Sequence, residues 1–457
     1  MAPTVSLSTK LAAEFIGTFL LVFTVGCNVL SANAVWGGVS IACVLMVSIY
    51  ALGGISGANF NPAVTLSIAL SQASGGAGMD WKTAGMYMGV QFLAGLCASI
   101  SYSVLFWNTF NLAPAPGFGF VSTGLCELLY TFMLCFVVLN VAVAKNKPNG
   151  FYGLAIGFVI VAGAYGAGAV SGGCFNPAVA LGIDLSSARQ GFGWSIYYTL
   201  CEFVGATLAS GLFYAVRPQD FGKDKSAGSA LISEFVGTFV LVLTVGLNVL
   251  GSSKAGAYSI AASLMCMIYA LGDISGAHFN PAVTIAILVS GRCEADLPPA
   301  RAGAYMGCQV AGALLAAGVY TLIYKGESFA LTPGAQFGYP EAAFVELIFT
   351  FVLCYVVLGV AVSRTTKDIT MFGLAIGACV TVGGNAIGAI SGGSLNPAVS
   401  IGLTAAGMYS GGSTIKSAII YSLFELAGGA AAAATFKATH AVDLEDAAAK
   451  DPLKEAA

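Results

Sequence analysis

The strongest constraint on the fold is a repeat that divides this 457-residue chain into two copies. Residues 13–27 return at 233–247 with ten of fifteen positions identical, and residues 49–65 return almost unchanged at 268–284. The offset is about 220 residues in both cases. A long period of this kind indicates duplicated structural units rather than one large domain.

Each copy also repeats itself internally. The tripeptide Asn-Pro-Ala begins at Asn61 and Asn176 in the first copy, 115 residues apart, and at Asn280 and Asn396 in the second, 116 residues apart. An odd number of membrane spans between two related segments would invert one relative to the other. Inverted repeats of this kind build many membrane transport proteins.

The composition requires a membrane environment. Hydrophobic residues make up 57% of the chain and charged residues 9%, and the mean hydropathy is +0.85. Apolar runs such as 15–30 and 128–144 approach the roughly 20 residues that cross a bilayer. Soluble enzymes and disordered chains are thereby excluded. A net charge of −3 and only two histidines, His278 and His440, leave no basic surface for nucleic acid.

Hydropathy predicts six spans per copy. Each span of the first copy has a counterpart at a similar position in the second copy. The first six are expected at 10–31, 34–52, 83–106, 120–143, 150–169 and 194–216, and the second six at 229–250, 256–271, 302–324, 342–363, 371–390 and 416–436. Between spans two and three, and between five and six, lie apolar segments too short to cross, such as 61–72 and 176–187. These segments are expected to be re-entrant.

The domain organisation follows from the repeat. We expect a first unit at 1–216, a cytoplasmic linker at 217–227, a second unit at 228–437 and a flexible cytoplasmic tail at 438–457. With both termini cytoplasmic, 14 of the 18 Lys and Arg residues face inward. The outward ones are Arg189, Lys254, Lys325 and Lys416. This is the positive-inside bias of membrane proteins.

The Asn-Pro-Ala segments are predicted to start short helices that line a pore. Asn is a favourable N-cap and Pro fits the first helical turn. Two half-helices that enter from opposite faces would place their positive ends and two amides at the bilayer midplane, which disfavours cations and protons. The residues concerned are Asn61, Pro62, Ala63, Asn176, Pro177, Ala178, Asn280, Pro281, Ala282, Asn396, Pro397 and Ala398.

These motifs and the six-span pattern resemble the aquaporin (major intrinsic protein) family, twice in one chain. The resemblance implies an all-α membrane protein of two fused six-helix bundles, with 12 transmembrane helices, four re-entrant half-helices and one pore per bundle. It implies that Glu14, Glu127, Glu234 and Glu346 brace the re-entrant loops. It also implies a homodimer that forms a four-barrel ring.

The family's four-residue constriction is carried over by spacing from each motif. It falls on Ile41, Ala164, Gly173 and Val179 in the first copy and on Ile260, Gly384, Gly393 and Val399 in the second. The aromatic residue, His and Arg of water-selective members are all missing. The resemblance therefore implies a wider, less polar opening for water and small uncharged solutes such as urea, ammonia, hydrogen peroxide and glycerol, with glycerol less favoured.

Two departures leave alternatives open. Spans six carry Glu202 and Glu425, which either brace the fold or take part in proton-linked transport. The mouth of the second copy has Asp273 and His278, where the first has Gly54 and Asn59. His278 titrates near neutral pH and could gate the pore, or it could simply hydrogen-bond.

Three classes of function remain after these observations: a passive channel, a secondary transporter that uses Glu202 and Glu425, and a structural membrane protein with closed pores. No combination of nucleophile and base suggests an enzyme, and the spacing of Cys and His suggests no metal site. No cofactor is expected, and the partners are the lipid bilayer and the solutes. The sequence does not distinguish a plasma membrane from a vacuole-type membrane.

Overall fold

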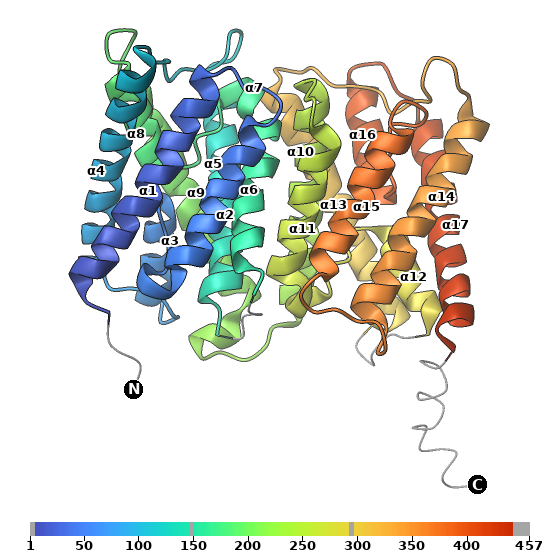
Figure 1. Ribbon diagram of the computed structural model, residues 1–457. Coiled ribbons are helices and arrows are strands. Elements are labelled where there is room, and N and C mark those ends of the chain that lie inside the picture. The colour runs from blue at the N-terminus through green and yellow to red at the C-terminus, as the bar shows by residue number, and fades with distance from the viewer. Residues whose placement is uncertain (1–4, 146–149, 292–296, 442–457) are drawn as a thin grey trace, which may run out of the picture. The chain divides into compact units, whose positions relative to one another are not determined.

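The computed structural model describes residues 5–145, 150–291 and 297–441, and every regular element in these ranges is a helix (Figure 1). The helices of the first repeat are α1 (Leu7–Leu30), α2 (Gly37–Ser56), α3 (Pro62–Ala73), α4 (Trp81–Phe106), α5 (Phe120–Val138), α6 (Tyr152–Gly166), α7 (Gly168–Ser171), α8 (Pro177–Ser186) and α9 (Trp194–Val216). A π-helical turn at Leu139–Val143 continues α5.

The second repeat has the same order of elements, except that none of its described helices corresponds to α7. Its helices are α10 (Ala227–Leu250), α11 (Gly256–Ser275), α12 (Pro281–Ser290), α13 (Pro299–Ile323), α14 (Tyr339–Val357), α15 (Phe372–Ile387), α16 (Pro397–Tyr409) and α17 (Ile415–Thr439). A π-helical turn at Leu358–Val362 continues α14, as in the first repeat.

Ten of the twelve predicted spans are confirmed, and the fifth span of each copy is a shorter helix than predicted. Among the described residues, ten helices are long and apolar enough to cross a membrane. The fifth span of each copy is shorter, because α6 has 15 residues and α15 has 16. Fifteen residues rise about 22 Å, less than the roughly 30 Å hydrocarbon core. After α6 the chain bends at Ala167, adds the single turn α7 and then enters the re-entrant segment.

The short helices α3 and α8 enter the first repeat from opposite ends. Figure 1 shows α3 in the lower half of this repeat and α8 in the upper half. The α3 helix contacts α4 and α9, while α8 contacts α4 and α9 from the other end, and the two half-helices also contact each other. The chain is thus an all-α membrane protein whose copies are inverted repeats.

Glycines let the re-entrant helices approach the spanning helices closely. A Cβ atom added to Gly95 in α4 would lie 2.5 Å from the carbonyl oxygen of Ala178 in α8. One added to Gly182 would lie 2.9 Å from the carbonyl oxygen of Gly95. In the second repeat, a Cβ on Gly429 would lie 2.6 Å from the carbonyl oxygen of Ala282. Without a hydrophobic driving force between helices in lipid, such close backbone packing supplies much of the attraction.

The chain divides into two compact units. The first unit comprises Met1–Ser229, Leu247–Ala270 and Ile323–Lys325. The second comprises Ala230–Gly246, Leu271–Leu322 and Gly326–Ala457. The boundaries at 216 and 228 that the repeat predicts remain predictions.

Some expectations fall partly on residues outside the described ranges. These are the tail from residue 442 onward and four basic residues counted as inward-facing, Lys147, Arg292, Lys450 and Lys454.

Candidate pore

Each Asn of the four Asn-Pro-Ala motifs caps a half-helix. The backbone of Asn61 is extended at φ −156°, and its Oδ1 accepts a hydrogen bond from the N–H of Ala63 at 2.8 Å. Asn176 caps α8 in the same way through Ala178 at 3.0 Å. Asn280 and Asn396 repeat this arrangement at the start of α12 and α16. The side-chain oxygen is therefore used locally, which leaves the amide N–H groups for other partners.

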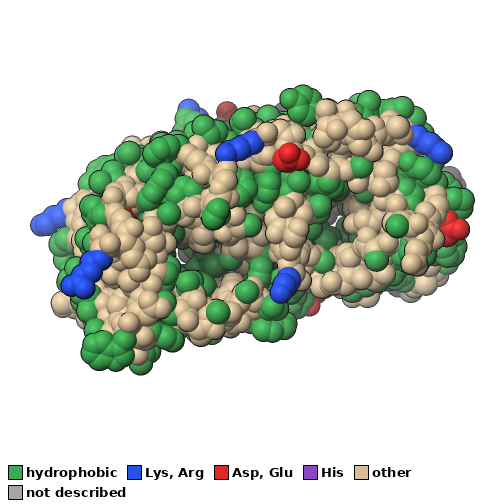
Figure 2. Space-filling view, turned by 90° about the horizontal axis from the view of Figure 1, so that it is seen from above, with side chains coloured by type: hydrophobic (Ala, Val, Ile, Leu, Met, Phe, Trp, Pro, Cys, Tyr) green, Lys and Arg blue, Asp and Glu red, His purple; other side chains and the backbone are tan. Residues whose placement is uncertain are grey.

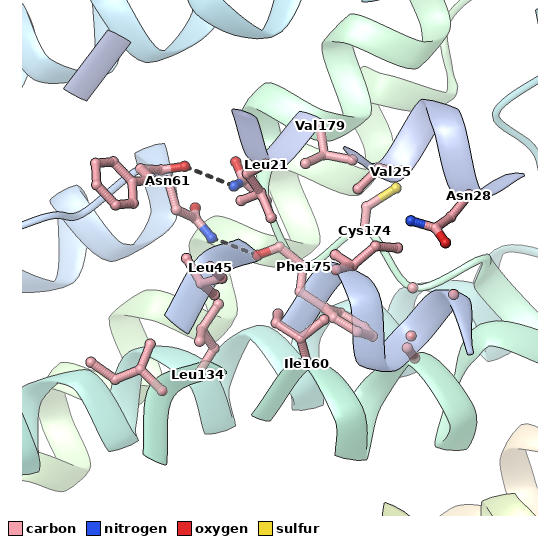
Figure 3. Close-up of a pocket in the computed structure, with 18 of the residues that line it drawn as sticks. Leu21, Val25, Asn28, Leu45, Asn61, Leu134, Ile160, Cys174, Phe175 and Val179 are labelled. Atoms are coloured by element: carbon pink, nitrogen blue, oxygen red, sulfur yellow. Dashed lines mark hydrogen bonds between the residues drawn. The ribbon is translucent and has the colours of Figure 1, made fainter. Parts of the chain in front are cut away.

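The two motifs of the first copy are joined by reciprocal hydrogen bonds. The Nδ2 of Asn61 donates to the carbonyl oxygen of Phe175 at 2.8 Å, and the Nδ2 of Asn176 donates to that of Phe60 at 2.9 Å. Figure 3 shows the bond from Asn61 to Phe175 at the inner part of the cavity. Each amide has two N–H groups, so the cross-bond uses only one of the two in each Asn.

The second copy has the same pair of bonds. Asn280 donates to the carbonyl oxygen of Leu395 at 2.8 Å, and Asn396 donates to that of Phe279 at 2.9 Å. All four Asn side chains are 3% exposed. The sequence spacing predicted that the motifs of one copy meet, and the structure brings them together twice.

The residue before each Asn has a left-handed backbone. Phe60 lies at φ 52°, Phe175 at 51°, Phe279 at 49° and Leu395 at 56°. Residues other than glycine rarely adopt this conformation, and it persists only where surrounding contacts enforce it. The turn orients the carbonyl oxygen of that residue toward the partner Asn.

Buried carboxylates supply the contacts that enforce these turns. The Oε1 of Glu14 accepts the N–H of Asn59 at 3.0 Å and the Oγ–H of Ser56 at 2.6 Å, and its Oε2 accepts the N–H of Phe60 at 2.8 Å. Gln91 donates its Nε2–H to the same Oε2 at 2.8 Å. Glu234 holds the equivalent segment of the second copy through Ser275, His278, Phe279 and Gln309.

The second re-entrant segment of each copy is held from α5 and α14. Glu127 accepts the N–H groups of Cys174 at 3.1 Å and Phe175 at 2.8 Å. Glu346 accepts those of Ser394 at 3.0 Å and Leu395 at 2.8 Å. The structure thus places all four predicted bracing carboxylates, each fully buried, against the re-entrant backbone.

A cavity of about 380 Å³ lies inside the first copy, and both Asn61 and Asn176 line it. Ile41, Ala164, Gly173 and Val179, the predicted constriction, all line it. Figure 3 shows Val179 and Cys174 beyond Phe175, on the side of the cavity away from Asn61. Every lining residue lies between Leu21 and Val179, so the first repeat builds this cavity alone.

The cavity wall is mostly aliphatic, and its polar groups are concentrated at a few positions. One of them, Asn28, was not predicted as a lining residue. Its Nδ2 donates to Ser40 Oγ at 2.9 Å and to the carbonyl oxygen of Thr24 at 2.9 Å, and its Oδ1 accepts from Asn33. A single Asn near the end of an apolar span is the signal that could have indicated it.

In the second copy, three of the predicted constriction positions, Gly384, Gly393 and Val399, belong to one compact unit, and Ile260 belongs to the other unit and stays a prediction. Gly393 approaches Gly384 closely, since a Cβ added to it would lie 3.2 Å from the Cα of Gly384. In the first copy a Cβ on Gly173 would lie 3.7 Å from the Cα of Ala164. The corresponding positions are thus neighbours in both copies.

His278 hydrogen-bonds within its own segment. Its Nδ1 lies 3.1 Å from Thr284 Oγ1, and its ring packs edge-on against Tyr305 at 5.3 Å between centroids. In the first copy Asn59 Nδ2 donates to Thr65 Oγ1 at 3.1 Å. The two side chains therefore make the same local contact, which favours the hydrogen-bonding interpretation over gating. Asp273 lies in the last turn of α11.

Among the described residues, no three His, Cys, Asp or Glu side chains gather closely enough to hold a metal ion. Half-helices that meet end to end, braced loops and an apolar cavity between spanning helices are together typical of a membrane channel.

Comparison with known proteins gives the family. The model of the major intrinsic protein family matches residues 1–214, 149–254 and 223–436. The chain therefore belongs to the major intrinsic protein family, as a tandem fusion of two units.

Individual relatives match about one copy each. The probable aquaporin NIP4-2 of Arabidopsis thaliana is 34% identical over 224 residues, which cover 46% of this chain and 75% of the relative. Aquaporin NIP1-1 of Zea mays is 35% identical over 227 residues, which cover 48% of this chain and 78% of the relative. The aquaglyceroporin structure from Plasmodium falciparum is 20% identical, covers 45% of this chain and 94% of that chain, and aligns with a TM-score of 0.38, too low to support any argument.

Membership of this family makes the chain an integral, multi-pass membrane channel for water and small solutes.

Proposed function

We propose that each copy forms its own pore, which passes water and small uncharged solutes such as urea, ammonia and hydrogen peroxide and excludes cations and protons at the paired Asn residues. The observation that carries this proposal is the cavity of the first copy, which contains both Asn amides and the four constriction residues and is lined by that copy alone.

Exclusion of cations follows from the half-helices. The N-termini of α3 and α8 carry partial positive charge, and Asn61 and Asn176 add N–H donors at the same place. A water molecule or urea carbonyl accepts hydrogen bonds there, whereas a cation is repelled by the partial positive charge of the helix ends and the donors. The same partial positive charge also opposes the passage of a proton.

Passage of solutes larger than water follows from the constriction. Ile41, Ala164, Gly173 and Val179 present only aliphatic groups and a glycine to the cavity, and none is charged. An Arg at the constriction would narrow the opening and add a positive charge, and both effects would favour water over larger solutes. The first copy has no Arg at these four positions. Ala180 directly follows Val179 where glycerol-conducting members carry Asp, so glycerol is expected to pass more slowly than urea.

Stopped-flow light scattering of proteoliposomes tests the proposal. Vesicles with the purified protein are challenged with sorbitol, urea and glycerol in turn, and empty vesicles give the background. Non-saturable flux of water and urea supports a channel. Saturable, gradient-coupled uptake would instead favour a secondary transporter, and no flux above background would favour a structural protein with closed pores.

We further propose that both termini are cytoplasmic and that two chains assemble into a four-barrel ring. Figure 2 shows Lys and Arg side chains spread over the upper face without a cluster. The support for the orientation is the placement of 14 of the 18 Lys and Arg residues on the predicted cytoplasmic side. Protease protection of terminal tags in sealed vesicles tests the orientation. Mass measurement of the detergent-solubilised protein tests the dimer.

A further inference from the structure

Two buried carboxyl groups meet behind the second re-entrant segment of the first copy. Glu127 on α5 accepts the backbone N–H groups of Cys174 and Phe175. Glu202 on α9 accepts the next one along the chain, from Asn176, at 2.8 Å through its Oε1. Both carboxyl groups are fully buried. Together they hold three successive N–H groups ahead of the half-helix α8.

The two carboxyl groups lie side by side, because Glu127 holds the N–H of Phe175 and Glu202 holds the N–H of the next residue, Asn176. The second oxygen of Glu202, Oε2, has no donor or other hydrogen-bond partner among the described residues when both groups are written as carboxylates. Two ionised carboxylates in contact in a dry interior repel each other strongly, and neither has a hydrogen to share. The contact between Glu127 and Glu202 is therefore satisfied only if one of them carries a proton.

The first half of the same copy, which is related to the second half by inversion, has a corresponding contact to its bracing carboxylate. There the bracing carboxylate is Glu14, and Gln91 donates an amide N–H to it at 2.8 Å. Glu202 stands beside Glu127 in the equivalent position, because α4 and α9 are the third spans of their respective half-repeats. An amide brings its own N–H, whereas a carboxyl group can donate only as the neutral acid.

We propose that Glu202 is held as a neutral carboxylic acid that positions Asn176: its Oε2–H donates to Glu127 while its Oε1 accepts the N–H of Asn176. Glu202 then donates an O–H to Glu127 in the second half of the copy, as Gln91 donates an N–H to Glu14 in the first half. It acts through Asn176 and Glu127, so it is a positioning residue rather than a group that contacts the solute.

The second copy provides a contrast at two positions. Ser400 Oγ donates to Glu425 Oε1 at 2.8 Å, and Ser394 Oγ lies 2.7 Å from Ser400 Oγ. The first copy has Ala180 in place of Ser400 and Cys174 in place of Ser394. A methyl group cannot donate and a thiol donates only weakly. Glu202 therefore lacks the hydroxyl partner that Glu425 has at Oε1, while Oε2 has no hydrogen-bond partner among the described residues in either copy.

The shared proton also keeps the buried charge low. With Glu202 neutral, each re-entrant segment of the first copy is held by one charged carboxylate, Glu14 or Glu127. A second negative charge beside Glu127 would offset the partial positive charge at the start of α8 and lower the barrier to cations. This consequence rests on the proposed exclusion of cations, but the protonation of Glu202 does not.

Infrared difference spectroscopy of the full-length protein in lipid tests the protonation directly. The wild-type spectrum minus that of Glu202→Gln should contain the carbonyl stretch of a protonated carboxylic acid, and this band should shift to lower frequency in D₂O. A difference spectrum without such a band would overturn the proposal, whatever solutes the pore passes.

The positioning role is tested by two matched variants. Glu202→Gln keeps a donor and an acceptor, whereas Glu202→Leu has a similar size and neither. We expect the Leu variant to lose about tenfold or more of the first pore's urea flux, because the buried N–H of Asn176 is left unpaired, and the Gln variant to rescue most of it. Background flux through the second copy is removed with Asn280→Asp and Asn396→Asp. Equal flux in the Gln and Leu variants would refute the positioning role.

Discussion

The side-chain amide of Asn61 donates to the carbonyl oxygen of Phe175, the residue before the other Asn, and Asn176 returns a bond to Phe60. Each half-helix therefore orients the segment that leads into the other. A change at one Asn should disturb both halves of the pore, because the carbonyl of Phe60 or Phe175 loses its donor.

This reciprocity makes the double replacement the cleanest way to disable one pore. Asn61→Asp with Asn176→Asp removes both cross-bonds and adds negative charge at the midplane, where a charge is costly and obstructs the path. We expect only the first pore to close, since residues of the first repeat alone line its cavity. Asn280→Asp with Asn396→Asp should close only the second.

The fluxes of these two variants, corrected for protein amount, should add up to roughly the wild-type flux in the stopped-flow assay. Complete loss of transport in either variant that still reaches the membrane would show that the copies share one path.

Selectivity should respond to charge at the constriction. Val179→Arg combined with Val399→Arg adds a long cationic side chain where each copy now has an aliphatic one. Urea and glycerol flux should fall more than water flux, because the opening narrows and larger solutes lose more room. Val179→Leu with Val399→Leu is the control for size without charge. Equal losses for all solutes would mean that these positions do not determine selectivity.

Thiol reagents should distinguish the two copies. Cys174 lines the cavity of the first copy, and the second copy has Ser394 at this position. A mercurial should therefore block the first pore preferentially and leave about half of the flux, if the copies conduct equally. The variant Cys174→Ser, which copies the second repeat, should resist the reagent. Full sensitivity in that variant would point to another cysteine.

Close packing of α4 on α8 should be sensitive to one methyl group. Gly95→Ala places a Cβ 2.5 Å from the carbonyl oxygen of Ala178, so the half-helix must shift at a cost of about 1–3 kcal/mol. Gly89→Ala on the same helix is the control, because nothing lies within 4 Å of the added atom. Thermal unfolding in detergent should show a lower midpoint for Gly95→Ala only. An unchanged midpoint would mean that the contact relaxes freely.

The elements themselves could be predicted from the sequence because they depend on local chemistry. A run of apolar residues must form a helix in lipid to satisfy its own backbone, and Asn-Pro at a helix start combines a cap with a residue that needs no hydrogen-bond acceptor. The spans and the half-helices at Pro62, Pro177, Pro281 and Pro397 therefore agree with expectation. The likeness of one copy to the other indicated the duplication, and the Asn-Pro-Ala repeat within each copy indicated the inversion.

Only the tertiary structure determines which residues far apart in the sequence contact each other. Nothing in the local sequence shows that the donor of Asn61 finds Phe175, that Asn28 lines the cavity, or that Glu202 accepts the N–H of Asn176. These contacts join residues that are 26 to 114 positions apart or depend on which side of a helix faces inward. In helices that are apolar all round, hydropathy gives no facing direction, so only the packing of one helix on another determines which side chains meet.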